Sequence, residues 1–191
     1  MYYQAQTFSI PELEGISKAT IEEHLGLYQG YVKHVNLIRE KINDHKNKSE
    51  PDPYLVAETR RRLGFEFGGM RNHEYYFSQF EGGAKKMPDG DLKDKINSEW
   101  GSFEDWSNSF KTLAMTRGVG WAMLYYDKKN NRLIQAWVDE QHLGQLADLD
   151  IVLALDVWEH SYMLDYPPSQ KKSYLEAFFK NLNWETVAKR V

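Results

Sequence analysis

The segment Asp156-Val157-Trp158-Glu159-His160 places a carboxylate and an imidazole four residues apart, directly after the apolar run 151–155. An apolar run of that length is typical of a buried strand, so we expect Asp156 at the end of a rigid element, with its charge facing the interior. A carboxylate in that position requires a cation or hydrogen-bond donors. The segment is therefore either part of a metal site or a pair of hydrogen-bonded core residues, and taken alone it leaves both interpretations open.

Two further histidines lie on helical patterns. His24 is followed by Tyr28 and Tyr31 at four and seven residues, so these three side chains project from nearly one side of a helix. His73 lies on a second helical pattern, four residues after Gly69. A helical hairpin could bring the two imidazoles together. With the carboxylate and imidazole of the first segment, the set becomes three neutral nitrogens and one anionic oxygen, which suits iron, manganese, cobalt or zinc.

The elements that must position these residues follow from the periodicity of the chain. Long helical patterns cover 17–47 and 54–80, and the polar connector between them contains two prolines, which predicts an antiparallel helical hairpin. The expected class is α+β: this hairpin, then a mixed part with a three-stranded antiparallel sheet and surrounding helices. We expect two domains, residues 1–86 and 87–191. The other expected elements are helices at 91–99, 103–115, 171–181 and 184–190 and strands at 121–126, 132–138 and 151–155.

Composition excludes several classes of protein. The chain has no cysteine, so disulfides, thiolate metal sites and a cysteine nucleophile are excluded. Its net charge of −4 argues against a general nucleic-acid binder. No apolar stretch is long enough to cross a bilayer, and the first six residues lack the basic start and apolar core of a secretory signal. We therefore expect a soluble, cytoplasmic protein that contacts neither membrane nor nucleic acid.

The chain resembles the iron/manganese superoxide dismutases over nearly its whole length. The segment 156–160 matches the signature of that family at every position, and Asn72-His73 followed by Tyr75-Tyr76-Phe77 is similar to its second-helix motif. Three shorter motifs also resemble the family: Ile21-Glu22-Glu23-His24-x-Gly26, Gly118-x-Gly120-Trp121 and Asn183-Trp184-Glu185.

The resemblance implies an activity and a metal site. The activity would be disproportionation of superoxide to oxygen and hydrogen peroxide, with one manganese or iron ion per subunit alternating between its 3+ and 2+ states. A solvent molecule would complete a five-coordinate site whose protein ligands are His24, His73, Asp156 and His160.

The same resemblance implies roles for residues around the ion. Tyr31 aligns with the tyrosine that gates substrate entry, if a one-residue deletion precedes it. Gln141 aligns with the glutamine that bonds the metal-bound solvent in manganese-type members, and Gly69 occupies the position where iron-type members carry theirs. Manganese is therefore favoured, although His142 beside Gln141 leaves a shifted alignment open, and a histidine at that position is associated with members that accept either metal. The remaining residues implied around the site are Trp121, Trp158, Glu159 and Tyr162.

Two departures from the family pattern concern assembly. Members usually carry a His-His pair shortly after the first ligand, and one of these histidines bridges to a tyrosine in His-x-Tyr-Tyr of the partner subunit. Here the first segment reads Tyr28-Gln29 and the second reads His160-Ser161-Tyr162-Met163, so both partners of the bridge are missing. We expect that Tyr28 and Met163 close the substrate funnel instead. Glu159, which in the family reaches a ligand histidine of the partner subunit, is retained. A homodimer, or a tetramer, is therefore expected.

Two other functions stay open at this point. The first is a metal-binding or structural protein on the same scaffold without dismutase activity. The second is a zinc hydrolase, which would need an open polar cleft and a free general base.

Overall fold

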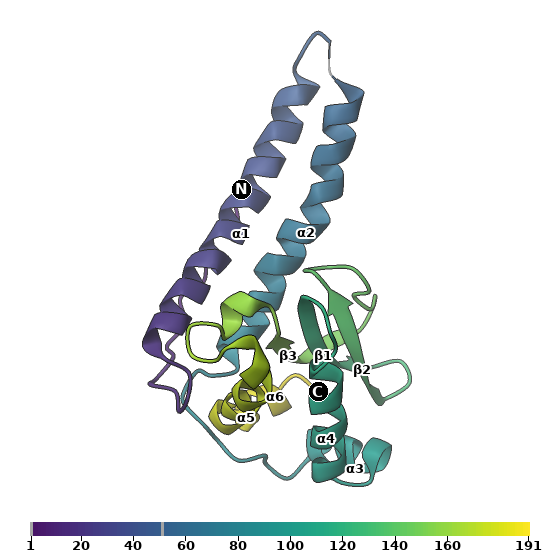
Figure 1. Ribbon diagram of the computed structural model, residues 1–191. Helices are drawn as coiled ribbons and strands as arrows, with labels where there is room; N and C mark the ends of the chain where they lie inside the picture. The colour runs from purple at the N-terminus through teal and green to yellow at the C-terminus, as the bar shows by residue number, and fades with distance from the viewer. Residues whose placement is uncertain (1, 51) are drawn as a thin grey trace.

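The first two helices form a long antiparallel hairpin. The computed structural model describes residues 2–50 and 52–191, so Met1 and Pro51, the latter in the predicted connector, lie outside the described residues. Helices α1 (Lys18–Lys46) and α2 (Pro53–Ser78) lie side by side and extend well beyond the rest of the molecule (Figure 1). The predicted bounds of both helices agree with the structure to within two residues.

Side-chain caps explain where the two helices begin. The Ser17 hydroxyl accepts a hydrogen bond from the Thr20 backbone, and the Asp52 carboxylate accepts from the backbone N–H groups of Tyr54 and Leu55. Such caps satisfy N–H groups that have no partner within the helix. α1 is α-helical at every position, and its buried side chains recur at intervals of three and four from Ile21 to Ile38. One face of α1 therefore carries both the core contacts and the first candidate ligand.

The N-terminal segment lies along this hairpin (Figure 1). Tyr3 exchanges two hydrogen bonds with the Asn36 side chain, each 2.9 Å, and the Gln6 backbone N–H donates to the Tyr28 hydroxyl at 2.8 Å. The first residues are thereby tied to α1 over more than two of its turns.

The sheet contains β1 (Gly120–Asp127), β2 (Arg132–Asp139) and β3 (Asp150–Asp156) in the order β2-β1-β3, and both pairings are antiparallel. The register sets Trp121 opposite Asp156. The end of β3 is thus aligned with the start of the central strand, which brings these two side chains to the same end of the sheet.

Short helices surround the sheet, and the α+β class is confirmed. The expected bounds hold to within one residue, except that the last helix ends two residues early. These helices are α3 (Asp91–Trp100), α4 (Phe103–Ala114), α5 (Lys171–Asn181) and α6 (Trp184–Ala188), with short 3-10 turns η1 (Glu159–Ser161) and η2 (Pro168–Gln170) between β3 and α5.

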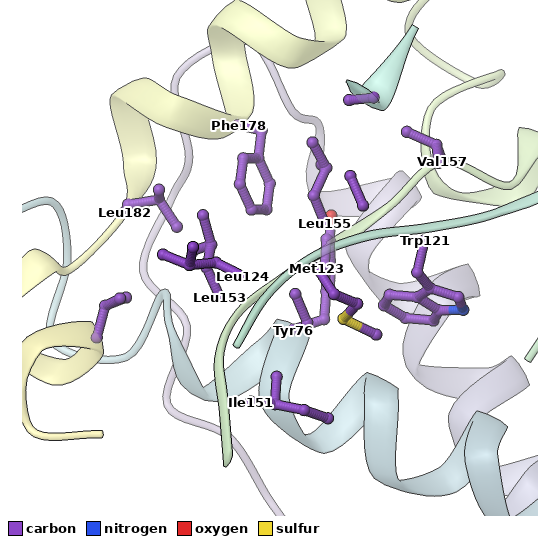
Figure 2. Close-up of a cluster of buried hydrophobic side chains, with 14 of the residues drawn as sticks. Tyr76, Trp121, Met123, Leu124, Ile151, Leu153, Leu155, Val157, Phe178 and Leu182 are labelled. Atoms are coloured by element: carbon purple, nitrogen blue, oxygen red, sulfur yellow. The ribbon is translucent and has the colours of Figure 1, made fainter. Parts of the chain in front are cut away.

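The core lies between the sheet, the end of α2 and α5 (Figure 2). Side chains from β1 and β3 meet Tyr76 of α2 and Phe178 of α5, and all of them are at least nine-tenths buried. Burial of each such side chain contributes roughly 1.5–3 kcal/mol. The ends of α2 and β3 are therefore fixed relative to each other. The labelled strand residues are Trp121, Met123, Leu124, Ile151, Leu153 and Leu155.

The length of α1 and α2 does not make them membrane helices. Across the described ranges, no helix combines the length and the apolar character that crossing a bilayer requires.

Candidate metal centre

Four ionisable side chains from four elements converge at one point. They are His24 of α1, His73 of α2, Asp156 at the end of β3 and His160 in the turn η1. One donor atom from each lies within 4.8 Å of every other. The first three side chains are fully buried, and His160 is partly exposed. The convergence predicted from the sequence is therefore present.

Hydrogen bonds orient the Asp156 carboxylate. Asp156 Oδ1 accepts a hydrogen bond from the Trp158 backbone at 2.8 Å, which leaves Oδ2 to face the imidazoles. The backbone carbonyl of Asp156 accepts from the hydroxyls of Ser161, at 3.0 Å, and Tyr174, at 2.8 Å. These contacts fix the end of β3 and the turn that follows it. The Asp156 carboxylate and the His160 imidazole therefore belong to one rigid unit.

The three imidazoles surround a single oxygen atom. Asp156 Oδ2 lies 3.1 Å from the Nε2 atom of His24, 3.2 Å from that of His160 and 3.5 Å from that of His73. The rings of His24 and His73 meet edge to face, with centroids 4.8 Å apart. Ligands bonded at about 2.1 Å to one ion lie about 3–4 Å apart, and the three distances from Asp156 Oδ2 to the imidazole nitrogens fall in that range.

Burial and charge set the protonation states of the site. Burial opposes ionisation of Asp156, but the charge and hydrogen bond of His160, together with those of His24, outweigh it and hold the pKa of the carboxyl well below its usual value. Burial lowers the pKa of His73 to about 3 and also lowers the pKa of His24. At neutral pH we therefore take the carboxylate as ionised and these two imidazoles as neutral.

The unpaired Nε2 atom of His73 fits a metal ion. His73 Nδ1–H donates to the Gly69 carbonyl at 2.6 Å, so Nε2 carries the lone pair and points toward the carboxylate oxygen. Among the described residues this Nε2 has no hydrogen-bond partner. A lone pair facing an anionic oxygen is unfavourable unless a cation lies between them. Three imidazoles and one carboxylate are a donor set for manganese, iron, cobalt or zinc.

A second layer consists of Gln141 held between Trp121 and Tyr31. Trp121 Nε1–H donates to Gln141 Oε1 at 2.9 Å, and Gln141 Nε2 donates to the Tyr31 hydroxyl at 3.0 Å. An indole can only donate, so the orientation of the amide is fixed. Tyr31 and Trp121 also pack against the His73 ring, with centroids 5.1 and 5.0 Å away. The oriented amide therefore lies directly beside a candidate ligand.

Two glycines of α2 make room for this layer. A Cβ atom at Gly68 would lie 2.1 Å from the Gln141 carbonyl oxygen, and one at Gly69 would lie 2.5 Å from the Tyr31 ring. Both distances are shorter than any real contact, so the loop and the ring approach α2 only because these side chains are absent. Asn72 Nδ2 donates to the Gln141 carbonyl at 3.0 Å and fastens the loop.

Comparison with known proteins decides the family. Residues 88–190 match the C-terminal domain of iron/manganese superoxide dismutases. An iron superoxide dismutase of Aquifex pyrophilus is 36% identical over 188 residues, covering 93% of this chain and 85% of that protein. The chain belongs to the iron/manganese superoxide dismutase family.

Some relatives of this chain are named iron superoxide dismutases and others manganese superoxide dismutases. An iron superoxide dismutase of Methanothermobacter marburgensis is 30% identical over 196 residues, covering 96% of this chain and 95% of that protein. A mitochondrial manganese superoxide dismutase of Glossina morsitans morsitans is 33% identical over 178 residues, covering 92% of this chain and 81% of that protein. Membership of the superoxide dismutase family therefore does not choose between the two metals.

Gln141 and His142 have different surroundings. Gln141 is fully buried and faces Tyr31, whereas the His142 ring lies against Gly64 and Phe65 of α2, outside the layer around the metal centre. In this superoxide dismutase family member, the residue whose amide reaches Tyr31 is therefore Gln141.

The other predicted residues lie at the outer side of the site. Trp158 stacks on the His160 ring, with centroids 5.6 Å apart, and its Nε1–H donates to the Glu140 carbonyl at 3.0 Å. Glu159 is exposed. The Tyr162 ring is buried and stacks on Tyr174. Trp158 therefore shields His160, the one candidate ligand that is partly open to solvent.

Tyr28, predicted to close the substrate funnel, is buried within this subunit, and its funnel role stays a prediction. Its ring has no exposed surface and packs against Phe8 and Phe77, while Met163 is half exposed. The Tyr28 hydroxyl accepts from the Gln6 backbone and donates to Glu74. The Tyr28 ring is therefore part of the core between the N-terminal segment, α1 and α2. The funnel role of Met163 stays a prediction.

Sequence reasoning missed Phe65. Its ring lies within 6.5 Å, centroid to centroid, of Tyr31, His142 and Trp158, so it joins the three segments around the partly exposed side of the centre. The signal was available, because positions 65, 69 and 73 recur every four residues and lie on one face of α2.

Proposed function

We propose that this chain catalyses the disproportionation of superoxide to oxygen and hydrogen peroxide, with one manganese or iron ion per subunit. The observation that carries the proposal is the buried convergence of His24, His73, His160 and Asp156 on one point. That donor set occurs in a chain whose relatives are named superoxide dismutases. A bound ion of either metal supplies one-electron exchange between its 3+ and 2+ states.

The protein side chains set the charge of the site. Three imidazoles and one carboxylate carry one negative charge in total, so they leave a trivalent ion with a net positive charge. This charge attracts a small anion. The reaction consumes two superoxide anions and two protons for each oxygen and peroxide formed. The site must therefore provide protons as well as electrons.

Tyr31 is the proposed proton donor. Its hydroxyl accepts a hydrogen bond from Gln141, so its own proton remains available for another acceptor. Burial, followed by the negative charges of Asp156 and Glu66, raises the pKa of Tyr31. The hydroxyl therefore holds its proton throughout the neutral range. Because the Tyr31 ring is partly exposed, solvent can replace a proton that is lost.

The site does not favour hydrolysis. A zinc hydrolase needs a carboxylate or imidazole that is free to act as general base. Within the described residues, the metal cluster holds one carboxylate, and Asp156 faces the three imidazoles. On α2, the Glu66 carboxylate is paired with Arg62 at 2.8 Å. These contacts favour electron exchange with a small substrate.

We also propose a preference for manganese. A glutamine at position 69, as in iron-type members, would force the Tyr31 ring to move, because even a Cβ atom there is 2.5 Å from it. The amide beside Tyr31 comes from Gln141, which is the arrangement of manganese-type members. Activity measured per bound ion should be higher for manganese than for iron. Equal or lower activity with manganese would contradict this preference.

We propose further that the protein works in the cytoplasm as a homodimer, or as a tetramer, with domains at 1–86 and 87–191. Glu159 is exposed beside His160, as a bridge to a partner subunit requires. The Tyr28 hydroxyl is engaged within its own subunit, which supports the absence of the family's cross-subunit tyrosine-histidine bridge. The match to the family's C-terminal domain begins at residue 88, next to the proposed boundary. Light scattering of the metal-loaded protein should give at least twice the subunit mass of 22.4 kDa.

The test combines metal analysis with superoxide decay. Purified protein is stripped of metal, reloaded separately with manganese, iron or zinc, and assayed by pulse radiolysis beside an Asp156→Asn variant treated identically. We expect rapid decay of superoxide with manganese or iron, none with zinc, and a large loss of bound metal in the variant. Stoichiometric manganese or iron without superoxide decay would support the scaffold function, and esterase activity with zinc would support the hydrolase.

A further inference from the structure

A polar cleft lies away from the metal centre, where the N-terminal segment, α2 and the C-terminal end of the chain meet. It has a volume of about 320 Å³. Its lining includes two arginines, one carboxylate and a serine, together with Gln6 and Tyr75. No residue of the donor cluster lines this cleft. The four charged or hydroxylated lining residues are Arg71, Glu74, Ser78 and Arg190.

Arg190 has no anionic partner in this cleft. Its guanidinium donates to the Val152 carbonyl at 2.8 Å, to the Tyr75 carbonyl at 3.2 Å and to the Ser78 hydroxyl at 2.9 Å. All three acceptors are neutral, and no carboxylate of the described residues lies within 4.0 Å of its nitrogens. By contrast, four other arginines each pair with a carboxylate: Arg61, Arg62, Arg71 and Arg132.

The charge of Arg190 is also poorly solvated. Burial lowers its pKa to about 10, and the guanidinium lies 5.1 Å from the centre of the Tyr75 ring. It still carries its proton at neutral pH. A buried guanidinium whose hydrogen-bond acceptors are all neutral, and which still has N–H groups without an acceptor, attracts an anion more strongly than a fully solvated surface charge does.

The nearby carboxylate does not neutralise this charge. Glu74 Oε2 accepts from Arg71 at 2.6 Å, and Glu74 Oε1 accepts from the Tyr28 hydroxyl at 3.2 Å. Both oxygens are therefore engaged. Two guanidinium groups and one carboxylate leave one net positive charge in the cleft, on a protein whose formal charge is −4.

We propose that this cleft binds a small oxyanion, a phosphate or a carboxylate group, through the free N–H groups of Arg190 and Arg71. Guanidinium groups present paired donors that match the spacing of such oxygens. This anion site is separate from the metal centre. The proposal that it binds an oxyanion does not depend on the proposed superoxide dismutase activity.

The test is thermal unfolding of the manganese-loaded protein with added anion. Inorganic phosphate and succinate are titrated separately at constant ionic strength, with chloride as the balancing salt. At tenfold excess over the dissociation constant, a bound anion should raise Tm by about 3–6 °C. A response to phosphate, to succinate or to both identifies which oxyanion the cleft accepts.

Three variants make the test specific. Arg190→Met removes the unpaired cation, and Gln6→Glu adds a carboxylate at the exposed rim while keeping Arg190 intact. Both should lose the anion-dependent rise in Tm. Arg117→Met removes the same charge from an exposed position outside the cleft lining and should keep the rise. No rise in the unaltered protein, or an equal rise in Gln6→Glu, would overturn the proposal.

Discussion

At the scale of single residues, the proposed supply of protons to superoxide depends on the Tyr31 hydroxyl. It is the only group lost in Tyr31→Phe, which keeps the ring against His73 and Phe65. General acid catalysis contributes about 10²–10⁴-fold, but water can enter beside a partly exposed ring and replace the lost donor in part. We therefore expect turnover at saturating superoxide to fall by about tenfold, measured by pulse radiolysis of the metal-loaded enzyme.

The matched control is Tyr126→Phe. That hydroxyl bonds to the Asn131 side chain at the far end of β1, so its loss should leave turnover unchanged. Equal turnover in Tyr31→Phe and the unaltered protein, at equal metal content, would contradict the role of Tyr31 as proton donor.

Burial of the His73 imidazole predicts acid sensitivity of the metal-free protein. Burial is the main cause that lowers its pKa from 6.5 to about 3. The unfolded chain therefore binds more protons than the folded chain between these values, so the free energy of unfolding decreases as pH falls from 6.5 toward 3. The decrease is at most about 1.4 kcal/mol per pH unit for one histidine.

Denaturant unfolding of the metal-free protein at pH 7, 6, 5 and 4 measures this effect. His73→Gln removes the titrating group and should flatten the dependence on pH. His34→Gln, at an exposed position of α1, should leave the dependence unchanged. Identical slopes in the unaltered protein and in His73→Gln would refute this assignment.

At the scale of elements, the approach of the loop 140–143 to α2 places Gln141. Gly68 permits that approach, since a Cβ atom there would lie 2.1 Å from the Gln141 carbonyl. Gly68→Ala should push the loop outward, break the bond from Asn72 and lower turnover at least tenfold, with destabilisation of about 1–3 kcal/mol from overpacking. Gly30→Ala meets no atom within 4 Å and should keep activity while stabilising α1 slightly.

Pulse radiolysis and chemical denaturation of the two glycine variants separate these outcomes. If Gly68→Ala retained full turnover at full metal content, the loop would not need its observed position, and the role of Gln141 would lose its structural support.

The elements themselves were largely predictable from the sequence. Helical periodicity, the Ser17 and Ser102 caps and the turn at residues 127–131 gave bounds close to those observed. Periodicity, caps and turns depend on residues that are close in the sequence, so a single sequence is enough to predict them. The direction in which Tyr28 points was not predictable in this way, because it depends on how the N-terminal segment and α2 pack around α1.

At the scale of the whole molecule, the convergence of the three histidines and Asp156 was predictable because their types and motif spacing are specific. The pairing of Gln141 with Tyr31 joins residues 110 positions apart and depends on the packing of two glycines against a loop. The cleft at Arg190 depends on three segments that meet only in the folded chain. Non-local contacts of this kind leave no periodic signal in a single sequence.

The most direct test of the central claim is a crystal structure of the metal-loaded protein with anomalous diffraction recorded at the manganese and iron edges. We predict one strong peak per chain, within bonding distance of Nε2 of His24, His73 and His160 and of Oδ2 of Asp156. A peak at any other site, or no peak from protein that contains stoichiometric metal, would contradict the account.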